Sequence, residues 1–186
     1  MTEQKKLTPT QEKVRKKKLI AIKTDLQSSE EVVVLDALKK VRKEGDASVI
    51  EYLVHTLVTS DSEVVQGEIV QILNTLKDSE TVEPLIDAIK DPKTKGYRNL
   101  LISAFWQAGL NVKGHLEFLV HTAMQENYLT AFECLTVIES ADEVGSREEI
   151  EQSLKQLAEY IEANQDKENF PVIQSIWQDL RNKLIG

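Results

Sequence analysis

Acidic and histidine side chains recur at matching positions along this sequence, and both types can bind metal ions or transfer protons. In three repeats, a glutamate is followed four residues later by a second titratable side chain, a spacing that places each pair on one face of a helix. One interpretation is a site for a metal or a cationic ligand. The alternative is a solvated ridge that recurs because the repeats share a pattern. The pairs are Glu51 with His55, Glu83 with Asp87, and Glu117 with His121.

Distance favours the solvated ridge. His55 and His121 belong to repeats that are two units apart, and packed helices are about 10 Å apart, so these side chains are expected about 20 Å apart. Ligands at that separation cannot share one metal ion. A structural zinc site is also improbable in a chain with one cysteine and three histidines. We therefore expect no metal and no cofactor.

No catalytic motif appears in the sequence. It contains no Gly-rich phosphate loop, no His-Glu-x-x-His, no Cys-x-x-Cys and no Gly-x-Ser-x-Gly. We therefore expect that the protein is not an enzyme.

Charge is distributed unevenly along the 186 residues. The chain has a net charge of −8, but residues 1–23 hold eight basic and two acidic side chains, while the rest is strongly acidic. An acidic body repels phosphate, so we expect no nucleic-acid partner. The basic start is either a docking arm for an acidic partner or a solvated first helix.

Other features of composition favour a cytoplasmic location. The single Cys134 cannot form an intramolecular disulfide, as is usual in a reducing compartment. No apolar stretch approaches about 18 residues, so neither a membrane span nor a membrane partner is expected. The polar start has no apolar core of the kind that a signal peptide needs.

A pattern of helical hairpins returns about every 32 to 34 residues and predicts the fold. Gly and Pro are sparse, and apolar residues recur at helical spacing, so we predict ten helices in five hairpins. Capping boxes are predicted at Thr8–Gln11, at Ser28–Glu31 and, 32 residues later, at Ser60–Glu63. The predicted inward residues include Val14, Leu19, Ile22, Val33, Leu38, Leu53, Ile69, Leu85, Phe105, Leu119, Leu129, Phe132, Leu135, Leu157 and Ile176.

The turns inside these hairpins resemble those of HEAT repeats, particularly the short bacterial type. Ser60–Val65 and Asp91–Arg98 are similar to the family's turn, with Arg98 at its usual arginine position and Gln66 in place of that arginine one repeat earlier. Leu76–Asp91 is the best match to the family's unit. The resemblance covers residues 28–125 most strongly. It implies an all-α, right-handed superhelix of about five HEAT-like hairpins, forming one domain over residues 1–186 with residues 1–9 as a flexible basic N-terminus.

The same resemblance implies that the second helix of each hairpin lines a concave surface. Its polar, mixed-charge side chains suit a protein or peptide segment better than a phosphate backbone. Trp106 lies in an apolar helical stripe, so we expect it to pack in the core; the alternative is that Phe105 takes the inward position and Trp106 faces this groove. The residues predicted to line it are Lys39, Arg42, Gln71, Asn74, Ser103, Trp106, Gln107, Thr136 and Glu139.

We therefore expect a non-enzymatic interaction or scaffold module that binds a protein or peptide partner and is a monomer or a weak homo-oligomer. The alternative is an enzyme, since some HEAT-like proteins are DNA-repair glycosylases and others resemble bilin lyases. A DNA-repair member is expected to carry Lys or Arg on the concave rows, where this sequence has mostly Gln, Ser, Thr and Asn.

Overall fold

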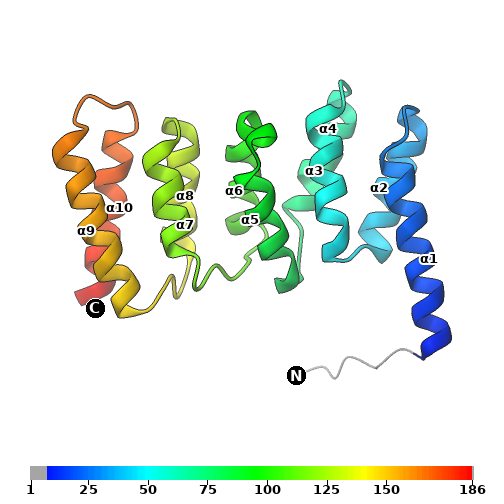
Figure 1. Ribbon diagram of the computed structural model, residues 1–186, viewed down its shortest axis with the longest axis horizontal. Coiled ribbons are helices and arrows are strands. Elements are labelled where there is room, and N and C mark those ends of the chain that lie inside the picture. The colour runs from blue at the N-terminus through cyan, green and yellow to red at the C-terminus, as the bar shows by residue number, and fades with distance from the viewer. Residues whose placement is uncertain (1–7, 186) are drawn as a thin grey trace. The chain divides into compact units, whose positions relative to one another are not determined.

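Helices make up almost all regular structure in residues 8–185, which are the residues that the computed structural model describes (Figure 1). The predicted all-α class is confirmed for this range, which contains ten α-helices and no strand. Three short 3-10 helices precede α3, α5 and α6. The α-helices are α1 (Pro9–Leu26), α2 (Glu31–Glu44), α3 (Ile50–Thr59), α4 (Glu63–Leu73), α5 (Val82–Lys90), α6 (Arg98–Gln107), α7 (Leu116–Gln125), α8 (Tyr128–Ser140), α9 (Arg147–Ala163) and α10 (Phe170–Ile185).

The start of α1 forms as the sequence predicts. The Thr8 hydroxyl accepts a hydrogen bond from the Gln11 backbone N–H at 3.3 Å, and the Gln11 side chain accepts one from the Thr8 N–H at 2.9 Å. This capping box satisfies two donors that a helix start leaves unpaired. Pro9 occupies the first turn, where its fixed φ suits the helix. The predicted flexible segment otherwise falls on residues 1–7, which lie outside the described residues.

Two predicted capping boxes are wrong. Helix α2 has Glu30 at its N-cap and no side-chain cap. The Ser28 hydroxyl instead accepts a hydrogen bond from the Glu30 N–H, at 3.1 Å, within the loop before the helix. At α4 the capping hydroxyl is that of Ser62, which accepts from the Val65 N–H at 3.3 Å. Short polar side chains compete for local backbone donors, so the Ser-rich spacing alone does not fix the capping residue.

The described residues divide into two units that meet in sequence between Ile72 and Leu73. In the first unit α1 packs on α2 and on α3. The buried Thr56 hydroxyl of α3 donates to the Leu26 carbonyl at the end of α1, at 3.0 Å. Between α2 and α4, the Arg42 guanidinium contacts the Glu68 carboxylate at 2.8 Å. The prediction of one repeat domain stays a prediction.

The second unit stacks equivalent helices of successive hairpins. Helix α7 packs on α8 within its hairpin and on α9 of the next, while α8 packs on α6 and on α10. First helices thus contact first helices, and second helices contact second helices. Helix α8 is enclosed on several sides and has one face left over.

The core follows most of the predicted register, including full burial of Phe105, Leu119 and Ile176. The exceptions are five residues predicted to point inward, and one of them is Trp106 of α6, which is exposed. Val14 of α1 and Val33 of α2 are exposed, as are Leu129 and Phe132 of α8. In α8 the core positions lie on the faces that pack against α6, α7 and α10. The buried residues of α8 are Thr130, Ala131, Cys134, Leu135, Val137 and Ile138.

Side chains at one repeat position, Gln66 and Arg98, donate hydrogen bonds to carbonyls near the end of the preceding helix. The Gln66 side chain donates to the Leu57 carbonyl at 3.3 Å and to that of Ser60 at 2.8 Å. The bond that corresponds to Gln66–Leu57 lies 32 residues later, where Arg98 Nε donates to the Ile89 carbonyl at 2.8 Å. The glutamine therefore replaces the arginine without loss of this contact.

Replacing Leu85 by alanine tests the register in the best-matched repeat. Leu85 is fully buried in α5, so the truncation should lower the free energy of unfolding by about 2–5 kcal/mol. Urea denaturation of the full chain measures the change. A loss no larger than that of a surface substitution would contradict the packing of α5.

Glu149 gives a pH-dependent contribution to stability. Hydrogen bonds from the Ser146 backbone and hydroxyl at the start of α9 hold the pKa of Glu149 below its usual range. Because the folded pKa is depressed, this stability is present above the ordinary glutamate pKa of about 4.3 and is lost as the pH falls through the folded value. Urea denaturation from pH 3 to pH 7 should therefore show a weaker acid dependence in Glu149→Gln than in the wild-type chain. The matched control is Glu148→Gln, which removes a neighbouring charge and leaves the capping box intact.

Candidate functional site

The exposed side of helices α6 and α8 carries an aromatic surface. The described residues expose ten large hydrophobic side chains, and four of them lie here. The three aromatic residues among those ten are all in this group. We call them the aromatic surface of α6 and α8. Its residues are Trp106, Tyr128, Leu129 and Phe132.

Helical spacing aligns these residues along α8. Leu129, Phe132 and Thr136 follow one another at i, i+3 and i+7, which places them on one face. The rings of Tyr128 and Phe132 stack with centroids 6.2 Å apart and an interplanar angle of 17°. The face runs from Tyr128 to Ser140, about 18 Å at the helical rise of 1.5 Å per residue.

A hydrogen bond fixes Trp106 beside this face. The indole Nε1 of Trp106 donates to Oε2 of Glu133 at 2.8 Å, which joins α6 to α8 across the surface. The indole is 40% exposed, whereas the adjacent Phe105 is buried in the core. The prediction that Trp106 packs in the core is wrong, and the alternative, in which Phe105 takes the inward position and Trp106 is accessible, is the one observed. A positioned, half-exposed tryptophan with its N–H already paired presents an apolar face to a partner.

A groove continues the surface at the ends of α6 and α8. Trp106 forms one wall, and the floor is apolar because Phe105, Val112 and Val137 contribute to it. The rim is acidic. It includes Asp142 and Glu143, and the Glu143 carboxylate is paired with Lys113. The ion pair lowers the pKa of Glu143 and raises the pKa of Lys113, so both side chains stay charged near neutral pH.

An ion pair and a buried asparagine hold α8 in place from its N-terminal end. Arg98, which also donates to the Ile89 carbonyl, pairs with Glu126 just before α8. The Asn169 side chain is buried and donates to the carbonyls of Ala123, at 2.8 Å, and Glu126, at 3.1 Å. These contacts fix the turn between α7 and α8, so the aromatic surface lies on a rigid support.

The residues predicted to line a groove fall into both units. In the first unit, Arg42 donates to Gln71 at 3.2 Å, so two of them meet. Lys39 is exposed and lies 3.8 Å from Asp36. Asn74, which belongs to the second unit, is half-buried, and its Oδ1 has no hydrogen-bond partner among the residues that the structure describes.

Of those in the second unit, Trp106, Gln107 and Glu139 are exposed, as predicted for a surface row. Thr136 is half-buried and its hydroxyl donates to the Phe132 carbonyl. The surface position predicted for Ser103 is wrong. Ser103 is buried where α6 packs into the core, and its hydroxyl donates to the Leu100 carbonyl at 2.9 Å.

Sequence reasoning missed Tyr128, Leu129 and Phe132 as surface residues. Helix α8 is apolar on two sides, and the larger side chains were assigned to the core. The sequence feature that indicates the buried face of α8 is its stripe of small residues, Ala131 and Cys134. Small side chains suit a helix on which several neighbours pack closely. Burial raises the pKa of the Cys134 thiol well above its ordinary value, so this thiol is not a reactive group.

The recurrent glutamate and histidine residues do not form a metal centre. His55 and His121 are exposed and lie in different units, and no three metal-ligating side chains gather anywhere in residues 8–185. His115 Nε2 lies 3.5 Å from a carboxylate oxygen of Glu83. Within the same range, no helix is long and apolar enough to cross a membrane.

Comparison with known proteins leaves the site to be interpreted from its own geometry. No protein-family model, curated protein or solved structure matches this chain.

Two substitutions within α8 test which of its faces is buried. Phe132→Ala should change the free energy of unfolding by less than about 1 kcal/mol, because the ring is half-exposed. Leu135→Ala, three residues away in the core, should cost about 2–5 kcal/mol. Thermal and urea unfolding compare the two. Equal losses would show that the aromatic side chain packs inward.

Proposed function

We propose that this chain is a non-enzymatic interaction module that binds a protein segment through the aromatic surface of α6 and α8. The observation that carries the proposal is the cluster of Trp106, Tyr128, Leu129 and Phe132 on a face that no other helix of its unit covers. Tyr128 and Phe132 stack on the exposed face of α8, and Trp106 is joined to that helix at Glu133. Exposed apolar clusters of this kind mark binding sites.

The chemistry of the rim favours a segment that combines apolar and basic side chains. The apolar side chains of the partner would cover the rings and enter the groove beside Trp106. Its Lys or Arg side chains would meet Glu139 and Asp142, which are both exposed. Aromatic anchors contribute most of the energy at such interfaces, while the rim charges orient the partner.

We further propose that the chain belongs to the HEAT-repeat type and winds as a right-handed superhelix. Two observations support this. Equivalent helices stack on one another in the second unit, and Gln66 and Arg98 make the same bond 32 residues apart. In that arrangement α6 and α8 belong to the concave row, and a rigid stack loses little entropy on binding. A cytoplasmic location stays a prediction.

A random-peptide library displayed on phage tests the function on the full chain. Selected peptides should carry Lys or Arg next to aliphatic or aromatic residues. For a synthetic peptide of the best sequence, Leu129→Ser with Phe132→Ser should raise the dissociation constant at least tenfold, because anchor residues typically contribute about 2 kcal/mol or more. Fluorescence anisotropy measures the binding.

The matched control replaces Val32 and Val33, which are exposed apolar residues on α2, by serine. This variant should bind the peptide as the wild-type chain does. Equal affinity for the wild-type chain and the α8 variant would contradict the proposal, as would tight, salt-sensitive binding of duplex DNA in place of peptide.

A further inference from the structure

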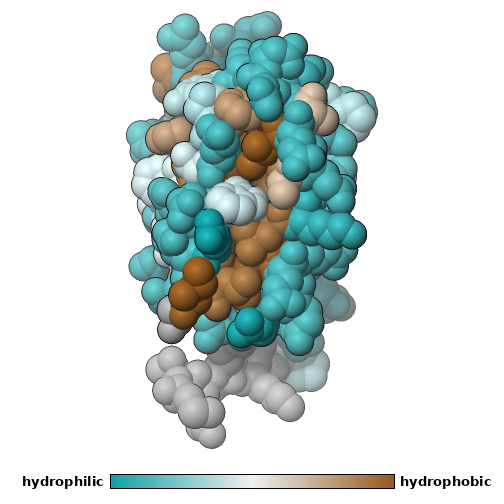
Figure 2. All heavy atoms as spheres, turned by 90° about the vertical axis from the view of Figure 1, so that its left-hand side faces the viewer, coloured by the Kyte–Doolittle hydropathy of each residue, from teal (hydrophilic) through white to brown (hydrophobic). Residues whose placement is uncertain are grey.

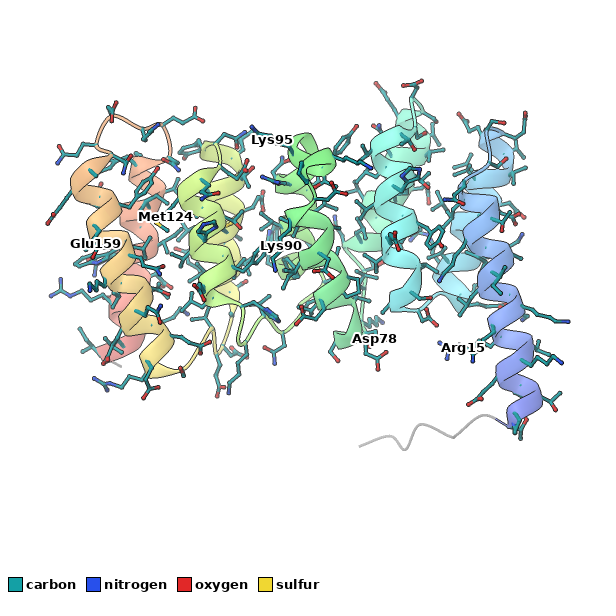
Figure 3. The ribbon with its side chains drawn as sticks, viewed as in Figure 1. Arg15, Asp78, Lys90, Lys95, Met124 and Glu159 are labelled. Carbon is teal, nitrogen blue, oxygen red and sulfur yellow. The ribbon has the colours of Figure 1, made fainter. Side chains whose placement is uncertain are left out.

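Basic side chains lie over aromatic rings elsewhere in the second unit. The ammonium group of Lys90, on α5 (Figure 3), lies 5.5 Å from the centroid of the Phe118 ring. Figure 2 shows a hydrophobic strip between hydrophilic ridges on the side formed by α9 and α10, where Trp177 lines a groove. The Arg181 guanidinium lies over this indole, 5.2 Å from its centroid. At such distances the face of an aromatic ring attracts a cation.

The rings of the aromatic surface of α6 and α8 have no such cation over them. Within residues 8–185, no basic side chain lies over Trp106, Tyr128 or Phe132, although all three are exposed. Tyr128 and Phe132 stack on one another, and Trp106 is held beside them by its bond to α8. A cation that reaches these rings therefore has to come from a partner.

Glu133 places a carboxylate beside these rings. It is half-buried, and its Oε2 accepts the indole N–H of Trp106 at 2.8 Å. In the part of the chain that the structure describes, no lysine, arginine or histidine forms an ion pair with Glu133. A carboxylate can accept about four hydrogen bonds, and the neutral indole uses one of them. Glu133 therefore lacks a counter-ion and keeps acceptor positions for one.

The neutral polar side chains next to Trp106 and Phe132 form hydrogen bonds within their own helices. Gln107 donates to the Ser103 hydroxyl at 3.3 Å, and the Thr136 hydroxyl donates to the Phe132 carbonyl at 3.0 Å. The Glu133 carboxylate is thus the group beside the rings that is best suited to a cationic donor, because a charge-assisted hydrogen bond is stronger than a neutral one.

We propose that Glu133 and the exposed rings beside it bind an arginine side chain of the partner segment. This assignment rests on the proposed function and names the polar anchor of the partner on that surface. The guanidinium donates to Glu133 while its plane lies on a neighbouring ring. Arginine suits the position better than lysine because it is planar, less strongly hydrated and rich in donors. The bond from Trp106 holds the carboxylate in place before the partner arrives.

Citrulline and lysine replacements in a bound peptide test the assignment on the wild-type chain. The probe is the tightest peptide selected from a random phage library, which should contain arginine. Citrulline has nearly the shape of arginine without its charge. At one arginine it should raise the dissociation constant about tenfold, as expected for loss of a charge-assisted hydrogen bond. Lysine at that position should also weaken binding, by about threefold or more. Fluorescence anisotropy measures both.

Glu133→Gln identifies the group that receives this arginine. Glutamine can still accept the Trp106 N–H, so the surface keeps its shape. With this variant, citrulline should raise the dissociation constant less than about twofold, because its partner charge is already gone. The matched control is Glu117→Gln, which removes an exposed charge from α7 and should retain the tenfold effect. Circular dichroism on heating confirms that both variants fold.

The outcomes separate this assignment from the proposed function. A citrulline effect that is equal in the wild-type chain and Glu133→Gln would overturn the arginine assignment. A tight peptide without arginine would also overturn it. In both cases the proposed function stands if Leu129→Ser with Phe132→Ser still weakens binding. A selection that yields no binding peptide would overturn the proposed function and the assignment together.

Discussion

The backbone carbonyl groups at the ends of short helices impose the constraint on which this structure depends. Each helix ends with carbonyls that have no partner within the helix, and burying them unpaired costs free energy. Here side chains from later in the sequence supply the donors. Thr56 donates to the carbonyl of Leu26, Arg98 to that of Ile89 and Asn169 to that of Ala123. Stacking thus satisfies polar groups as well as burying apolar ones.

This constraint explains why the aromatic surface of α6 and α8 is both exposed and well positioned. The contacts of Arg98 with Glu126 and of Asn169 with the end of α7 fix the turn from which α8 starts. Helices α6, α7 and α10 then pack on α8, and its small side chains allow the close approach. Tyr128, Leu129 and Phe132 remain on the outer face of α8, where a partner can reach them. A rigid support and an exposed apolar face are together what a binding module needs.

Much of the fold could be predicted from the sequence because helical spacing and capping act locally. The apolar positions of α3 and α5 and the capping box of α1 required only neighbouring residues. The caps of α2 and α4 could not be predicted, because several serines compete for the same backbone donors. The register of α8 depends on how closely three other helices approach it. The spacing of apolar residues in the sequence contains no information about these distances.

The candidate site could be predicted only in part, because only some of its residues depend on local sequence. Phe105 and Trp106 compete for one inward position, and the sequence offered both outcomes but favoured the core for Trp106, which is exposed. Ser103 was placed on the surface because it is polar, but its hydroxyl is satisfied within its own helix and so can be buried. Leu129 and Phe132 were assigned to the core because large apolar residues usually occupy it.

Amide hydrogen exchange tests the central claim most directly. Mass spectrometry would measure the exchange of the full chain in two states. In one the chain is free, and in the other it is saturated with the tightest peptide selected from a random library. The account predicts slower exchange in the peptides that cover α6 and α8, whose backbone the ligand stabilises, and no change in α1 or α2. Protection confined to other helices, with α6 and α8 unchanged, would contradict it.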